Sequence, residues 1–117
     1  MTETDVIAAV ATARGPGAIV IVRLSGPDLS RFVFPLCGRP LHARQAVLTD
    51  FLDADGKPLD TGIALFFQSP ESYTGEDVLE LHGHGGTARE RHQGRLRQVR
   101  CLLDAVRVRG RRGVRVS

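Results

Sequence analysis

The stretch SYTGEDVLELHGHGG, residues 72–86, combines many side chains that can do chemistry. It places three carboxylates, two histidines, one tyrosine and four glycines within fifteen positions. Carboxylates and imidazoles transfer protons or bind metals, and glycines let the backbone approach a ligand closely. Such a density is typical either of a functional site or of a crowded loop.

Two charged residues interrupt apolar segments. Glu80 stands between two leucines, and Arg23 lies near the end of the run GAIVIVRLSG. A buried charge needs hydrogen-bonding partners, so each residue must face solvent, a polar cavity or a partner. One interpretation is a structural ion pair between them. The other is that both line a pocket, in which Arg23 binds a ligand carboxylate and Glu80 accepts from the N–H edge of a heterocycle.

The remaining polar residues of this stretch give weaker signals. His82 and His84 could bind a metal together with Glu80 or Asp77, since residues i and i+2 of a strand share one face. No third histidine or cysteine follows at a recognisable spacing, so we expect no metal site. We expect Glu76 and Asp77 to be solvated, as loop carboxylates usually are.

The glycines favour a tight turn over a nucleotide site. Gly83, Gly85 and Gly86 follow a predicted strand, where exposed N–H groups could bind an anion. The sequence contains no G-x-x-x-x-G-K-[ST] motif, and its one lysine, Lys57, lies in a predicted hairpin turn. We therefore interpret the glycines as a turn from a strand into a helix.

Composition indicates a globular chain of 117 residues, either one domain or one domain with an appendage. No apolar run approaches the roughly 20 residues that span a bilayer, so we expect no membrane span. Cys37 and Cys101 lie far apart, and no signal peptide is evident. These features predict a reducing, cytoplasmic location.

The elements that position Arg23 and Glu80 can be read from apolar runs and turn residues. We predict strands over about 5–12, 17–26 and 78–83, a short helix within 25–38, and a hairpin within 46–67 turning at DADG. The continuous apolarity of the second run predicts a strand covered on both faces. Strands in pairs with helices between them predict an α+β domain with a mixed β-sheet and one or two packed helices.

Charge divides the chain in two. Residues 1–86 hold six basic and eleven acidic groups, whereas residues 87–117 hold ten arginines and two acidic groups. The second part predicts an amphipathic helix over about 95–108, with Leu103 and Val106 on its apolar side, inside a tail that is partly helical or disordered. An Arg-rich tail also makes an RNA-binding module an alternative function.

Two long motifs resemble a known family. VATARGPGAIVIVRLSG, followed at family-like spacing by DADGKPLDTGIALFFQSPESYTGEDVLELHGHGG, resembles the N-terminal part of the MnmE (TrmE) family of tRNA-modification GTPases. The resemblance covers residues 5–86 and departs from the family pattern at the segment ARGPGA.

This resemblance implies a domain that dimerises and binds 5-formyl-tetrahydrofolate, a one-carbon donor. Its fold would be similar to the folate-binding domain of aminomethyltransferases. The arginine and the glutamate that contact folate in the family correspond to Arg23 and Glu80. A ligand-free dimerisation domain is the remaining alternative.

For the full-length family protein, the resemblance implies a GTP-hydrolysing enzyme with GTP, Mg²⁺ and K⁺. Together with a flavoprotein partner, that enzyme modifies the wobble uridine of certain tRNAs at C5. We expect residues 1–86 to form the folate-binding and dimerisation domain, and this chain alone not to hydrolyse GTP. The family pattern is lost from residue 87, so we hypothesise that residues 87–117 are a frameshifted terminus, which the other reading frames of the encoding DNA beyond codon 86 would test.

Overall fold

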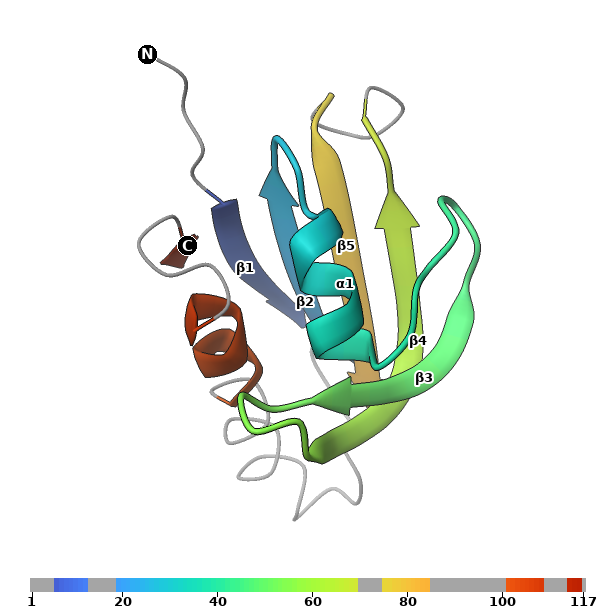
Figure 1. Cartoon of the computed structure of the whole chain (residues 1–117), viewed down its shortest axis with the longest axis vertical. Helices are drawn as coiled ribbons and strands as arrows, with labels where there is room; N and C mark the ends of the chain where they lie inside the picture. Colours follow the sequence, from blue (N-terminus) through green and yellow to red (C-terminus); the bar gives the residue numbers. More distant parts are fainter. Residues whose placement is uncertain (1–5, 13–18, 70–74, 85–100, 109–113, 117) are drawn as a thin grey trace.

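The computed structural model describes residues 6–12, 19–69, 75–84, 101–108 and 114–116. Within these residues the chain forms a mixed, six-stranded sheet with two helices that pack on one face (Figure 1). The elements are β1 Val6–Thr12, β2 Ile19–Gly26, α1 Ser30–Cys37, β3 Val47–Leu52, β4 Pro58–Phe67, β5 Asp77–His84 and β6 Val114–Val116, with a further helix over residues 101–108. The predicted α+β class is confirmed.

The sheet brings distant segments of the chain together. Its strand order is β3-β4-β5-β2-β1-β6, in which every neighbouring pair is antiparallel except β1 and β6. β5 therefore lies between β2 and β4, although β2 precedes it by more than fifty residues. This central position puts residues 77–84 of the chemistry-rich stretch in the middle of the sheet.

The strand β2 alternates between two environments, so within one chain only one of its faces is fully covered, in contrast to the prediction. Val22 and Leu24 are fully buried in the core, whereas Ile21, Arg23 and Ser25 are half-buried on the other face. Val22 and Leu24 pair with Leu81 and Leu79 of β5 and share their face. We call the face with the helices the core face and the other the second face.

The helix α1 begins without a side-chain N-cap and ends at a glycine. Leu29 precedes it and is fully buried, and Asp28 accepts hydrogen bonds from the Ser30 N–H and hydroxyl at 3.0 and 2.7 Å. Gly38 has a φ of 69° and donates to the Phe34 carbonyl, which ends the helix after eight residues. Pro35 lies inside this last turn, in agreement with the predicted short helix.

The helix over residues 101–108 packs into the same core as the strands. Its fully buried side chains are Leu102, Ala105 and Val106, while Leu103 packs only partly against the core. The predicted helix is thus confirmed where it is described. Val106 is buried as predicted, but Leu102 and Ala105 are buried in place of Leu103. The predicted turns before residue 101 lie outside the described residues. Neither described helix is long and apolar enough to cross a membrane.

The turn between β3 and β4 is longer than predicted. A tight hairpin reversal through Asp55 and Gly56 requires positive φ angles at both residues, but only Gly56 has one, at 83°. Asp53 shapes the turn instead, because its carboxylate accepts from the N–H groups of Asp55 and Lys57 at 2.9 Å each. A side-chain acceptor of this kind replaces part of the backbone turn geometry.

Cys37 and Cys101 are free thiols, and Cys37 is part of the core. Burial raises the pKa of the Cys37 thiol to about 12. The thiol therefore stays protonated at neutral pH and acts as a small apolar side chain.

Asp77, the first residue of β5, ties three segments of the fold together. It is 5% exposed, so the prediction of a solvated carboxylate was wrong for Asp77, whereas Glu76 is exposed as expected. One oxygen accepts from the Leu29 N–H at 3.0 Å and the other from the Ser69 N–H at 2.9 Å. Asp77 thereby satisfies the backbone at the start of α1 and after β4, which explains its burial.

We predict that Asp77→Ala destabilises the fold far more than removal of an exposed carboxylate. The substitution leaves two backbone N–H groups without acceptors, which costs about 2–4 kcal/mol in the free energy of unfolding. Urea denaturation followed by circular dichroism measures this change. The matched control Asp55→Ala removes an exposed carboxylate and should change stability by about 0.5 kcal/mol or less; equal effects of the two substitutions would contradict the assigned role of Asp77.

Candidate functional site

The register of the sheet places Arg23 of β2 directly opposite Glu80 of β5. Their side chains form an ion pair: the Arg23 Nε donates to the Glu80 Oε2 at 2.8 Å, and the Arg23 Nη2 lies 2.7 Å from the same oxygen. The two residues singled out in the sequence are therefore brought together. Their direct contact agrees with the interpretation as a structural ion pair. It also limits the interpretation as a ligand pocket, because two side chains in contact must face the same part of any ligand.

His82 completes the cluster from the same strand. Its Nε2 lies 2.8 Å from the Glu80 Oε1, so the two carboxylate oxygens are engaged by different residues. Gly62 of β4 helps to place this part of β5, because a Cβ at that position would collide with the His82 carbonyl and lie 2.9 Å from the Phe51 ring. The sequence offered a signal for His82, its i, i+2 spacing from Glu80. The metal hypothesis applied this spacing to His82 and His84 and considered Glu80 only as a further ligand.

Burial and pairing act on Glu80 in opposite directions. The side chain is 8% exposed, and this desolvation alone would raise the pKa of the carboxyl group. The hydrogen bonds from His82 and Arg23, together with their attraction for the negative charge, outweigh desolvation and lower the pKa of Glu80 below its ordinary value of 4.5. Glu80 is therefore ionised at neutral pH and acts only as a hydrogen-bond acceptor.

The cluster lies on the second face, among aliphatic side chains. Its cross-strand neighbours there are Ile21, Ile63 and Leu65, all half-buried. The Arg23 side chain is 43% exposed, so its guanidinium reaches from the buried carboxylate toward the surface. A buried anion beside a partly accessible cation can present an acceptor and a donor to one ligand.

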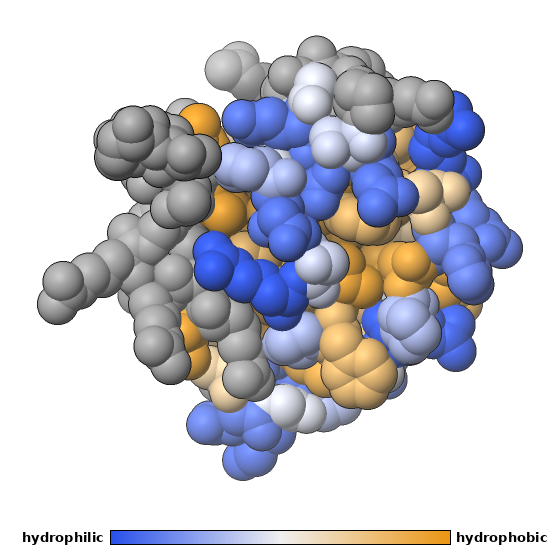
Figure 2. All heavy atoms as spheres, turned by 45° about the horizontal axis from the view of Figure 1, so that its top comes forward, coloured by the Kyte–Doolittle hydropathy of each residue, from blue (hydrophilic) through white to orange (hydrophobic). Residues whose placement is uncertain are grey.

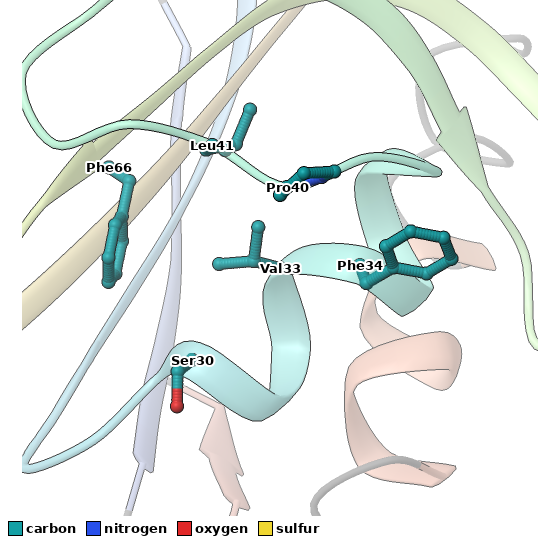
Figure 3. Close-up of a pocket in the computed structure, with 6 residues that line it drawn as sticks. All are labelled: Ser30, Val33, Phe34, Pro40, Leu41 and Phe66. Atoms are coloured by element: carbon teal, nitrogen blue, oxygen red, sulfur yellow. The ribbon is translucent and has the colours of Figure 1, made fainter.

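A small hollow lies on the opposite side of the sheet. It has a volume of about 210 Å³ and is lined by Ser30, Val33, Phe34, Pro40, Leu41 and Phe66 (Figure 3). Hydrophobic side chains reach the surface among hydrophilic ones on the face shown in Figure 2. The volume of the hollow is below the roughly 300–1,000 Å³ typical of small-molecule sites. Because Phe66 belongs to the core face, the hollow is separate from the Arg23–Glu80 cluster on the second face.

A metal site finds no support among the residues that the structure describes, because they contain no group of three potential ligands. Asp77 points to the core face and is engaged by backbone N–H groups, while Glu80 is on the second face. The two carboxylates considered as ligands beside His82 therefore do not converge. The side chain of His84 lies outside the described residues.

Comparison with known proteins agrees with the resemblance seen in the motifs. The family described as GTP-binding protein TrmE N-terminus matches residues 6–109, which is most of the chain. The chain belongs to the TrmE family. The match extends beyond residue 86, where the two quoted motifs end.

Curated relatives in the TrmE family are full-length tRNA modification GTPases named MnmE. The chain is 61% identical over 84 residues to MnmE of Ralstonia nicotianae, a match that covers 72% of the chain and 18% of that protein. It is 57% identical over 82 residues to MnmE of Bordetella parapertussis, a match that covers 70% of the chain and 18% of that protein. It is 54% identical over 84 residues to MnmE of Methylococcus capsulatus, a match that covers 72% of the chain and 19% of that protein. The chain spans about a fifth of the length of these relatives.

We predict that the contribution of Glu80 to stability depends on pH. Because its pKa is lower in the folded protein, the contribution is present above the ordinary pKa of 4.5 and is lost as the pH falls through the folded value. Near pH 7, Glu80→Gln should reduce the free energy of unfolding by about 1–3 kcal/mol. The deficit should shrink near pH 3, where the wild-type side chain also becomes neutral.

Urea denaturation at a series of pH values measures this difference. Asp55→Asn, which neutralises an exposed carboxylate in the turn between β3 and β4, is the control and should have a small effect at every pH. A deficit of Glu80→Gln that stays constant from neutral to acidic pH would exclude the ion pair as its cause.

Proposed function

We propose that this domain binds 5-formyl-tetrahydrofolate at the Arg23–Glu80 cluster and forms a homodimer. In a full-length TrmE-family GTPase it would serve the modification of the tRNA wobble uridine at C5 in the cytoplasm, with a flavoprotein partner. The observation that carries the proposal is the buried, ionised Glu80 held by a partly exposed arginine in an otherwise aliphatic region.

The chemistry of the cluster fits the heterocyclic end of a folate. The pyrimidine part of a pterin presents N–H donors beside a carbonyl acceptor. Glu80 can accept from N–H groups, and the neighbouring guanidinium of Arg23 can donate to a carbonyl. Aliphatic neighbours on the same face suit a flat, weakly polar ring.

The geometry of the cluster indicates that Arg23 and Glu80 would contact the same end of the ligand. A p-aminobenzoyl group separates the pterin of a folate from its glutamyl carboxylates. Since Arg23 contacts Glu80 at 2.7 Å, both residues must act at the same end. We therefore assign Arg23 to the pterin together with Glu80, and the glutamyl tail to residues outside the cluster.

We expect calorimetric titration of the dimer with 5-formyl-tetrahydrofolate to show specific heat that depends on the cluster. Arg23→Ala and Glu80→Ala should each weaken binding by about tenfold or more, because each removes a charged hydrogen-bonding partner. Arg31→Ala, which removes an exposed arginine from α1, is the matched control and should leave affinity unchanged. Retained affinity in both cluster variants would remove these residues from the site, and the absence of heat from the wild type would reject folate binding.

The second face also supports the proposed dimer. Ile7 is 46% exposed and Leu48 is 65% exposed, and no described helix packs on the face from which they project. Exposed apolar area of this kind is commonly covered by a partner, and a second copy of the same surface gives a closed two-fold assembly.

We predict a concentration-dependent dimer in sedimentation equilibrium that is weakened about tenfold or more by Ile7→Glu. The substitution places a charge at the proposed contact, where it would lose its water on association. Val108→Glu charges another exposed aliphatic residue, 57% exposed and on the other side of the sheet, and should have no such effect. A monomer at every concentration would reject the dimer. The alternative function, an RNA-binding module in the Arg-rich tail, predicts a separate result: tRNA affinity that falls steeply as the salt concentration rises.

A further inference from the structure

The bond between His82 and Glu80 determines the state of the imidazole. Glu80 is ionised at neutral pH and can only accept, so the proton in this 2.8 Å contact must lie on the Nε2 of His82. A neutral imidazole carries one proton. Its Nδ1 is therefore an acceptor, in the same way that a carboxylate fixes the tautomer of a catalytic or metal-binding histidine.

The Nδ1 of His82 remains available for a further bond. Within the described part of the chain, His82 makes no hydrogen bond except the one to Glu80. Its side chain is 24% exposed and lies on the second face, with the aliphatic residues Ile21 and Ile63 opposite it on the two neighbouring strands. An oriented acceptor in such surroundings can select a ligand that brings a donor.

We propose that His82 is a third ligand-binding residue, whose Nδ1 accepts a hydrogen bond from an N–H group of the folate bound at Arg23 and Glu80. This inference rests on the proposed function and adds a specific acceptor to it. Glu80 then has two roles, because it binds the ligand directly and holds the His82 ring in the tautomer that the ligand requires. The ligand class is a heterocycle with at least two N–H donors.

The arrangement makes ligand affinity depend on pH. Among the described residues, the charged groups that face His82 are Glu80 on its own strand and Arg23 on β2; the residues opposite it are uncharged. When the imidazole is protonated, its Nδ1 becomes a donor and repels an N–H group of the ligand. Protonation of the imidazole should therefore weaken ligand binding.

The test compares wild type, His82→Gln and His82→Leu by calorimetric titration with 5-formyl-tetrahydrofolate from about pH 8 to pH 5.5. A glutamine amide can donate to Glu80 and accept from the ligand at every pH, so it imitates the neutral imidazole. Protonation of the wild-type imidazole under acidic conditions should weaken binding by about tenfold, since the hydrogen bond is both lost and replaced by repulsion. His82→Gln should keep nearly the alkaline wild-type affinity at every pH, and His82→Leu should be weaker by about fivefold to tenfold throughout.

Two further measurements keep the outcomes distinct. Long-range ¹H–¹⁵N correlation spectra of the ligand-free protein should show the Nε2–H tautomer for His82 near pH 8, and an Nδ1–H tautomer would overturn the inference. Thermal unfolding of each variant verifies that it is folded. If His82→Gln retains the wild-type pH dependence, or folded His82→Leu binds as tightly as wild type, His82 has no role while folate binding stands; if the wild type does not bind folate at any pH, both proposals fall.

Discussion

A carboxylate buried in the middle of a β-sheet must be paired, and the pairing of Glu80 organises the second face of this domain. Water is removed from the side chain, so its charge is tolerated only because Arg23 and His82 supply hydrogen bonds at 2.7–2.8 Å. These partners come from different directions, one across the sheet and one along the strand. The carboxylate is thereby fixed in orientation, and the orientation of the two partners follows from it.

The alternation of β5 explains how one strand serves both the core and the site. Leu79 and Leu81 point into the core with the helices, and Asp77 on the same side fastens the backbone before α1 and after β4. Glu80 and His82 point to the other side. A shift in register by one residue would exchange these sets and bury the charges among aliphatic side chains. The packing of the leucines therefore fixes the positions of the polar residues.

The sequence allowed β1 to β5, the helix α1 and, as one of two interpretations, the Arg23–Glu80 pair to be predicted, because each depends on local patterns. β6 was not predicted, since it lies in the segment expected to be a partly helical or disordered tail. Apolar runs bounded by glycine mark β2 and β5, and an isolated charge within such a run signals a partner or a cavity. The strand order was not predictable in this way, because the pairing of β2 with β5 joins segments more than fifty residues apart. Asp77 was misjudged for the same reason: its two partners are backbone groups of remote segments, and backbone donors leave no trace in a sequence.

His82 shows the limit of reading residue types without their surroundings. Its spacing from Glu80 was visible, but the same spacing fits a metal pair, a hydrogen-bonded dyad and two solvated side chains. The choice depends on whether further ligands converge, and Asp77, one of the candidates, faces the opposite side of the sheet.

A charged cluster at this place also demands a reason beyond stability. Apolar residues of similar volume often replace a buried ion pair without loss of stability, and the neighbours of Glu80 on this face are already aliphatic. An all-aliphatic patch would lack directional donors and acceptors, whereas the cluster offers a cation, an anion and an imidazole within a few ångströms. In the proposed function, these directional groups would recognise a polar heterocycle, and the sheet would hold them in place before the ligand binds.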